Sequence, residues 1–455
     1  MAALMAVSAI CVGQAVQVAN GNQKPLAIAW LTGAFVCLIP ATVNVSIPLV
    51  ERAQRWFPIF LLGLGLVLQF TQLSSRSPGM YLQISPRAFA TFLAGVSAAA
   101  VVAGASMSEK GWLGPARLPL LLAIHFSLGV WLIKASPSPV IDVYVWHRES
   151  LNALLRGHNP YAMTMPNIYG DAGFYAPELV ANGRVLVGYP YPPLTLLLSI
   201  PGHLAGDYRY TQLAAMTLAA AFMVYARPGI LGGVAAALFL FTPRVFFVLE
   251  QGWTDPLCVT MVAATVFAAC RVPKLLPYAL GLLFAVKQYL IFAMPIAFLL
   301  STDINTFRRY GNVLAKAVAV AAVITLPFLV LDVRAFVFDM VGMQALQRLR
   351  LDALSYIAFF TVNGISLPIW LGFALLPVAF LVCIFRAPRS PAGFACSIAL
   401  ITTTFFAFGK QAFCNYYFFI IGAICCAISA VQPSPEVRAA SDESRGDAGV
   451  PILRS

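Results

Sequence analysis

One acidic residue, Asp142, stands in a polar segment between two apolar stretches of the chain. If residues 142–156 are helical, four polar residues share one face, at positions i, i+7, i+10 and i+14: Asp142, Glu149, Asn152 and Arg156. A carboxylate at a membrane surface can act as a general base and take the proton of a substrate hydroxyl. It can equally cap the helix, because aspartate accepts backbone N–H groups at helix N-termini. The sequence leaves both interpretations open.

The other residues of this helix indicate how it lies. Its apolar side carries Trp146, which predicts a helix along the membrane interface with the indole as an anchor. The run Asn159-Pro-Tyr161 ends the helix, since proline disfavours a helical conformation in the residue before it.

Cations that could bind an anionic phosphate follow later in the chain. Lys287 has apolar residues on both sides, and an ionisable group in such a place is treated as functional by default. It either binds phosphate or extends to the membrane interface. Further candidate phosphate ligands are Arg348, Arg350 and Lys410.

Asp255 and two tyrosines are candidate contacts for a polar substrate. Asp255 precedes Pro256 and either hydrogen-bonds a substrate hydroxyl or caps the helix that starts there. Tyr189 and Tyr191 flank the prolines that open the next apolar block, where missing N–H groups cost little. These rings either stack on a sugar or mark the membrane interface.

The composition identifies the solvent of the fold. Hydrophobic residues make up 60% of the chain and charged residues 10%, with a mean hydropathy of +0.83, whereas soluble domains carry about 25% charged residues. The blocks are apolar all round, which excludes the alternation of barrel strands. We therefore predict an all-α, polytopic integral membrane protein with about 10–13 transmembrane helices.

Hydropathy divides the chain into three parts. Residues 1–110 are predicted to be an N-terminal extension of transmembrane helices, and residues 111–431 a catalytic unit with large external loops at about 136–188 and 332–365. Residues 432–455 are polar and predict a disordered cytoplasmic tail. Two of the apolar blocks are ambiguous: 191–204, which re-enters or is an incomplete span, and 276–300, which breaks at Lys287.

The net charge of +12 comes from 29 Lys and Arg residues scattered between the spans. A nucleic-acid-binding protein would cluster them on one face, so we expect no nucleic-acid partner. By the positive-inside rule, seven of these residues mark the cytoplasmic side: Arg227, Arg271, Lys274, Arg308, Arg309, Arg386 and Arg389. Asp142 would then share the opposite face with Asp255, Lys287 and Lys410.

The nine cysteines lie almost entirely in apolar blocks without metal-ligand spacing. Buried free cysteines behave as small hydrophobic residues, which favours a packing role over disulfides or zinc. No cluster of carboxylates suits a cation either, so we expect no metal and no cofactor.

Several motifs together resemble a known enzyme group: Asp142-Val-Tyr, Gly157-His-Asn-Pro-Tyr161, Tyr189-Pro-Tyr-Pro-Pro-Leu194, Gln251-Gly-Trp-Thr-Asp-Pro256, Val286-Lys-Gln-Tyr289 and Lys410-Gln-Ala-Phe-Cys-Asn-Tyr-Tyr417. They are similar to the polyprenyl-phosphate-sugar-dependent glycosyltransferases of the GT-C fold, most of all to the mannosyltransferase-like glycosyltransferase family 87. The resemblance covers roughly residues 117–431. The four additional spans at the N-terminus depart from the family pattern.

The resemblance implies an inverting membrane glycosyltransferase. It would move mannose or another hexose from a polyprenyl-phosphate donor to a glycan or glycolipid acceptor, at the extracytoplasmic face of a bacterial inner membrane. Asp142 matches the family's catalytic base, and Asn159 and Tyr161 belong to the matching motif. The alternatives are a transporter or flippase of a lipid-linked or polar substrate, which predicts internal repeats that the chain lacks, and an oligosaccharide ligase or polymerase.

Overall fold

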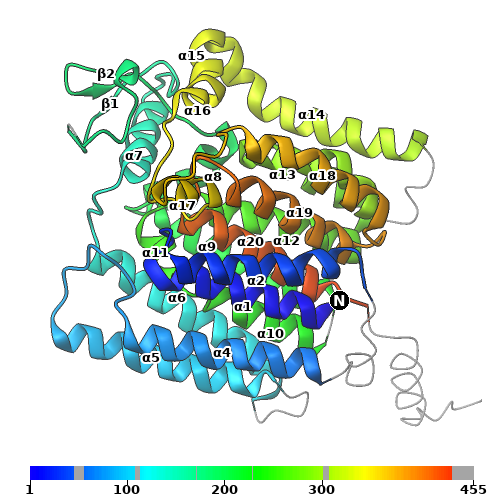
Figure 1. Cartoon of the computed structure of the whole chain (residues 1–455). Coiled ribbons are helices and arrows are strands. Elements are labelled where there is room, and N and C mark those ends of the chain that lie inside the picture. Colours follow the sequence, from blue (N-terminus) through cyan, green and yellow to red (C-terminus); the bar gives the residue numbers. More distant parts are fainter. Residues whose placement is uncertain (46–55, 108–112, 171, 228, 301–306, 433–455) are drawn as a thin grey trace, which may run out of the picture.

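Nearly all regular structure in the described residues is helical, as predicted, apart from three two-residue strands. The computed structural model describes residues 1–45, 56–107, 113–170, 172–227, 229–300 and 307–432. Figure 1 shows long helices running side by side, with α7 and the strands at one end of the bundle and the N-terminus at the other. The predicted tail, except for Gln432, lies outside the described residues.

In the part of the chain that the structure describes, six helical segments are long and apolar enough to cross a membrane. Each has at least 18 residues, which at a rise of about 1.5 Å per residue approaches the ~30 Å thickness of a bilayer core. They are α1 (Ala2–Ala19), α2 (Pro25–Thr42), α4 (Phe57–Ser75), α5 (Pro86–Ala105), α6 (Arg117–Ala135) with the preceding turn η1 (Gly114–Ala116), and α14 (Phe307–Leu331). These segments identify a helical, multi-pass membrane protein.

The N-terminal helices pack directly against the C-terminal half of the chain. Helix α1 contacts α20 (Cys414–Ser429), α2 contacts α19 (Pro391–Ala407), and α4 contacts α10 (Ile230–Leu240). One continuous hydrophobic core runs through all of these helices. The extension and the predicted catalytic unit therefore share their interior.

The other helices of the bundle include several that are shorter than a membrane span. The apolar block at 276–300 does break at Lys287, which has an extended backbone (φ −158°, ψ 144°). The block at 191–204 contains α8, which has 12 residues, or about 18 Å of helix, too short to cross the bilayer core as a single straight span. The helices of the bundle that have not yet been named are α8 (Pro193–Leu204), α9 (Arg209–Ala226), α11 (Val245–Glu250), α12 (Asp255–Arg271), η3 (Pro273–Leu275), α13 (Leu276–Val286), η4 (Gln288–Leu300) and α18 (Leu371–Arg386).

Charged residues lie at both ends of α12 and α13. Asp255 begins α12 and Lys287 follows α13, and their side chains meet. The opposite ends of the same two helices carry Arg271 and Lys274. These four residues thus lie at two ends of α12 and α13, while the sorting of the other charged residues and the side that faces the cytoplasm stay predictions.

The predicted helix after Asp142 is present as α7 (Asp142–Leu155). A small antiparallel sheet of β1 (Met165–Pro166), β3 (Arg184–Val185) and β2 (Val180–Ala181), in that order, follows it together with the turn η2 (Pro177–Leu179). Trp146 is 3% exposed and packs in one cluster with Met165, Val185 and Tyr175. The prediction that Trp146 anchors the helix at the membrane interface is therefore wrong, because the chain's own strands cover the indole.

The second predicted external loop, 332–365, is folded into short helices. They are α15 (Val333–Val337), the π-helical turn η5 (Phe338–Gly342), α16 (Met343–Leu346) and α17 (Tyr356–Val362). Phe336 of α15 packs on Tyr161, with ring centroids 4.7 Å apart. This segment thus lies against the segment that follows α7.

Two buried charged residues connect the ends of the helices near α7. Arg209 is fully buried and forms an ion pair of 2.6 Å with Asp207. Its guanidinium also donates to the carbonyl oxygens of Ser136 (2.8 Å) and Glu250 (3.1 Å). The Glu250 carboxylate accepts the backbone N–H of Met80 at 2.6 Å. The ends of α6, α9 and α11 and the connection after α4 are therefore tied together by polar contacts.

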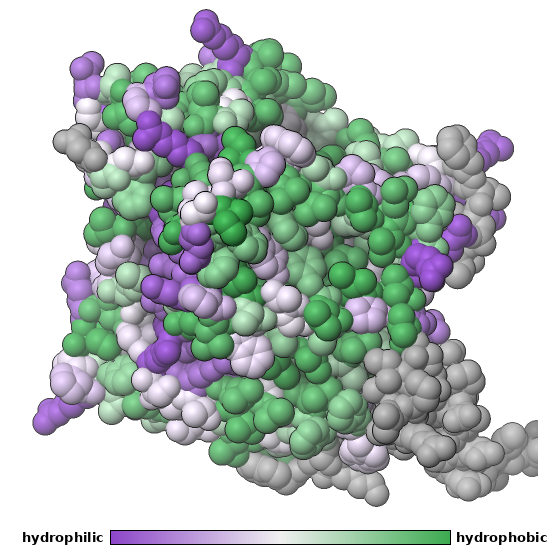
Figure 2. All heavy atoms as spheres, in the orientation of Figure 1, coloured by the Kyte–Doolittle hydropathy of each residue, from purple (hydrophilic) through white to green (hydrophobic). Residues whose placement is uncertain are grey.

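Surface composition agrees with a membrane environment. Figure 2 shows apolar side chains over much of the visible side of the bundle, with hydrophilic side chains gathered toward its left and right ends. The left end is the one that carries α7 and the strands in Figure 1.

Candidate functional site

The centre of the candidate site is a buried ion pair between Lys287 and Asp255. The Lys287 ammonium donates to both oxygens of the Asp255 carboxylate, at 2.9 and 3.0 Å. Lys287 is 4% exposed and Asp255 is fully buried. The pair joins the extended residue between α13 and η4 to the first residue of α12.

Two further donors complete the environment of the Asp255 carboxylate. The Tyr289 hydroxyl donates to Oδ1 at 3.0 Å and the Asn415 amide donates to Oδ2 at 2.8 Å. Thr254 occupies the N-cap position of α12, and no side-chain cap is formed there. The interpretation of Asp255 as a helix cap is therefore wrong, since its carboxylate is used by tertiary contacts instead.

Three tyrosine rings surround the Lys287 ammonium. Its nitrogen lies 5.4–5.5 Å from the ring centroids of Tyr191, Tyr289 and Tyr416. A cation at this distance is attracted by the negative faces of aromatic rings. Lys287 therefore does not extend to the membrane interface, and its charge is already balanced by Asp255.

Asp142 is the first helical residue of α7, and Ile141 takes the N-cap position. One carboxylate oxygen accepts the N–H of Val143 at 2.8 Å, and the other accepts the hydroxyl of Tyr175 at 3.0 Å. Burial raises the pKa of the Asp142 carboxyl, and these two hydrogen bonds oppose that effect. The carboxylate thus accepts a backbone N–H of the first turn, although Asp142 does not hold the N-cap position. Its raised pKa makes it a stronger base than a solvent-exposed aspartate.

Tyr191 links the surroundings of the two carboxylates. Burial raises the pKa of its hydroxyl well above the usual value, and the negative charges of Asp142 and Asp255 raise it further. The Tyr161 hydroxyl donates to the Tyr191 carbonyl at 2.8 Å, and the Tyr161 N–H donates to the Asn159 side chain at 3.1 Å. The motif that ends α7 therefore holds the backbone of Tyr191.

Arg350 brings a positive charge to the same region. Its guanidinium lies over the rings of Phe174 (4.3 Å) and Phe413 (4.9 Å) and pairs with Asp352 at 2.7 Å. The charge of Arg350 lowers the pKa of Asp142, against the larger effect of burial. Three segments far apart in the sequence thus meet around Arg350.

The other predicted cations lie apart from the carboxylates. The Lys410 ammonium donates to the Ala345 carbonyl at 3.0 Å, and burial lowers its pKa. Arg348 is exposed, and its carbonyl accepts from Gln411. The structure brings neither of them into contact with Asp142 or Asp255.

Tyr189 is fully buried in a polar network inside the site. Its hydroxyl lies 2.9 Å from His147 Nε2 and 2.8 Å from the Thr195 hydroxyl. Burial lowers the pKa of His147 to about 3, so this imidazole is neutral. Tyr189 thus packs against α7 through His147. Because the side chain is fully buried, neither face of its ring is accessible to a sugar.

One acidic residue of the region escaped the sequence analysis. Asp339, in the π-helical turn η5, is 2% exposed, and its Oδ2 has no hydrogen-bond partner. Burial raises its pKa to about 8. A Cβ atom at Gly188 would lie 2.5 Å from that oxygen, which explains the glycine at this position. No local pattern in the sequence pointed to it, because its burial depends on the packing of the 332–365 segment.

Candidate metal ligands do not gather elsewhere. Within the described ranges, no group of three or more His, Cys, Asp or Glu side chains could hold an ion, and all nine cysteines are free. Asn415 and Tyr416 belong to the first turn of α20, and their only signal in the sequence is the motif Lys410–Tyr417, which joins α19 to that helix.

The comparisons with known proteins add no identity. No family model, no curated protein and no solved structure matches this chain.

Proposed function

We propose that the protein is a membrane glycosyltransferase of the GT-C kind, which moves a hexose from a polyprenyl-phosphate donor to a glycan or glycolipid acceptor. The proposal rests on the motif resemblance and on one observation. Asp142 heads α7 with its carboxylate held by Val143 and Tyr175, and the charges of Asp142 and Arg350 affect each other. The charge of Asp142 also acts on Tyr191, whose ring contacts the ammonium of Lys287.

In the proposed reaction, Asp142 removes the proton of the acceptor hydroxyl. The hydroxyl oxygen then forms a bond to the anomeric carbon with inversion, and the bond from that carbon to the lipid phosphate breaks. The phosphate leaves with the bonding electron pair. General-base assistance of this kind contributes about 10²–10⁴-fold to the rate, and a raised pKa brings the carboxylate nearer to the working pH.

Arg350 is the cation best placed for the departing phosphate. Its side chain is 26% exposed and its partner Asp352 is 44% exposed, so a phosphate can replace that carboxylate on the planar guanidinium. Lys287 is already neutralised by Asp255. In this proposal Lys287 positions the rings of Tyr191, Tyr289 and Tyr416 by its cation–π contacts with them. This assignment replaces Lys287 and Lys410 with Arg350 as the phosphate ligand.

The test compares two aspartates with different roles. Asp142→Asn preserves the side-chain shape and an acceptor for the Val143 N–H, but the amide cannot take a proton. We expect sugar transfer to fall by about 10² or more with an unchanged melting temperature. The matched control is Asp332→Asn, because Asp332 caps α15 by accepting the Ala335 N–H at 2.9 Å and asparagine caps equally well.

Transfer is followed in membranes with a radiolabelled polyprenyl-phosphate hexose, and melting in detergent. An Asp142→Asn protein that melts like the wild type and transfers sugar at the same rate as Asp332→Asn would remove Asp142 from the active site. Labelling of single cysteines from outside intact cells tests the proposed extracytoplasmic face of the α7 end.

A further inference from the structure

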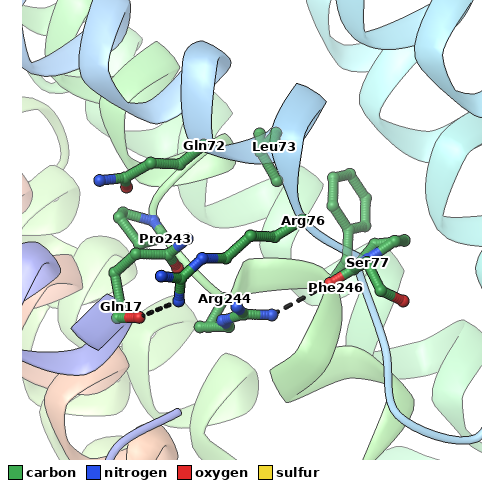
Figure 3. Close-up of a pocket in the computed structure, with 9 residues that line it drawn as sticks. Gln17, Gln72, Leu73, Arg76, Ser77, Pro243, Arg244 and Phe246 are labelled. Atoms are coloured by element: carbon green, nitrogen blue, oxygen red, sulfur yellow. Dashed lines mark hydrogen bonds between the residues drawn. The ribbon is translucent and has the colours of Figure 1, made fainter. Parts of the chain in front are cut away.

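Two arginines from different parts of the chain meet in a hollow next to the connection between α4 and α5. Arg76 follows α4 in the N-terminal extension, and Arg244 precedes α11 in the C-terminal half. The hollow is open to solvent and is also lined by Gln17, Gln72 and Ser77. In Figure 3 the two guanidinium groups lie next to each other.

Neither guanidinium is neutralised by a carboxylate among the described residues. Arg76 donates to the Gln17 carbonyl at 2.6 Å, and Arg244 donates to the Ser77 carbonyl at 3.0 Å. These neutral acceptors use one nitrogen of each side chain. The buried Nε of Arg244 has no partner.

The backbone of Arg244 is also unusual. Its φ of 66° lies in the left-handed region, which costs energy for any residue with a Cβ atom and occurs preferentially at functional sites. Burial lowers the pKa of Arg244, and the neighbouring charge of Arg76 lowers it further. The fold therefore holds two like charges together, and neither is paired with a carboxylate among the described residues.

We propose that the hollow between Arg76 and Arg244 binds a phosphate group. Paired guanidinium forks match the oxygens of phosphate, and their planar geometry gives bidentate contacts. A bound phosphate accepts hydrogen bonds from both guanidinium groups and removes the repulsion between the two cations. The phosphate joins the N-terminal extension to the rest of the chain, and none of its ligands belongs to the Asp142 and Lys287 clusters.

The first test measures the melting temperature of the full chain in a neutral detergent, with phosphate or chloride at equal ionic strength. At saturating phosphate we expect a rise of about 2 °C or more, since a ligand that binds only the folded state stabilises it. The rise should disappear in Arg76→Gln/Arg244→Gln. The control Arg87→Gln/Arg156→Gln removes the same charge from two exposed arginines and should keep the rise.

A second measurement distinguishes free phosphate from a lipid headgroup. The proteins are placed in nanodiscs of phosphatidylcholine, with or without phosphatidylglycerol, and melted in chloride. Stabilisation of wild type and control, but not of the Arg76/Arg244 variant, by the anionic lipid alone assigns the site to a headgroup, and stabilisation by phosphate in detergent assigns it to the free anion. Equal responses of all three proteins, or no response of the wild type to either probe, overturn the proposal.

Discussion

The buried pair of Lys287 and Asp255 predicts opposite pH dependences for its two single variants. In Asp255→Asn the ammonium loses its counter-ion, and in Lys287→Met the carboxylate loses its counter-ion. A buried side chain that has lost its counter-ion can become neutral by losing or gaining a proton. Ordinary pKa values are about 10.4 for lysine and 3.9 for aspartate, so at pH 7 deprotonating the ammonium costs about 5 kcal/mol and protonating the carboxylate costs about 4 kcal/mol. These values agree with the loss of about 3–5 kcal/mol seen when buried pairs are broken.

The contacts in the structure refine this estimate. In Lys287→Met the Asp255 carboxylate still accepts hydrogen bonds from Tyr289 and Asn415. In Asp255→Asn the ammonium keeps one amide oxygen and the tyrosine rings, whose attraction is about 0.5–2 kcal/mol. We therefore expect Asp255→Asn to be the less stable variant. The double variant has no lone charge and should recover most of the loss.

The assay is the melting temperature of the four proteins in detergent between pH 6 and pH 8. A lone ammonium is neutralised as pH rises, so Asp255→Asn should become more stable at higher pH. A lone carboxylate is neutralised as pH falls, so Lys287→Met should become more stable at lower pH. In each single variant the free energy of unfolding changes by at most about 1.4 kcal/mol per pH unit. The double variant should have the pH dependence of the wild type. Slopes of the same sign in both single variants, or melting of both at the wild-type temperature, would refute a buried charge pair.

Two further predictions concern the neighbours of Asp142. The pKa of His147 is about 3 when folded and about 6.5 when unfolded, so its contribution to stability is fully present above pH 6.5 and is lost as pH falls below it. Acidification from pH 6.5 to 5 should therefore destabilise the wild type by about 2 kcal/mol more than His147→Gln, measured by melting. Arg350 lowers the pKa of Asp142, so Arg350→Gln should move the acidic limb of the pH–rate profile for sugar transfer to higher pH, besides slowing transfer. An unchanged limb would show that Arg350 does not act on the base.

Local patterns in the sequence predicted the elements better than their contacts. The amphipathic residues after Asp142 predicted α7 within one residue of its end, and the charge at Lys287 predicted the break between α13 and η4. Both features depend on neighbours in sequence. The interface role of Trp146 was wrong because its cover comes from strands of two residues each, too short to leave a periodic pattern.

Long-range pairing explains the remaining differences. Lys287 and Asp255 are 32 positions apart, and each alone has the features of a substrate ligand. Their mutual contact follows from the packing of α12 against α13, which hydropathy does not specify. In the sequence, Arg350 is one of several candidate phosphate ligands. Only the packing of Phe174 and Phe413 against its guanidinium distinguishes it from the others.

The contacts of Arg209 bear on the order in which the protein is assembled during synthesis. Asp207 neutralises the guanidinium within the same turn of chain, so the charge is balanced before α9 is complete. The Ser136 carbonyl has already been translated by then, whereas the Glu250 carbonyl follows 41 residues later. A ribosome-bound chain that stops before α11 thus holds this arginine with an acceptor missing. The α7 end can therefore acquire its full set of Arg209 contacts only after α11 has been synthesised.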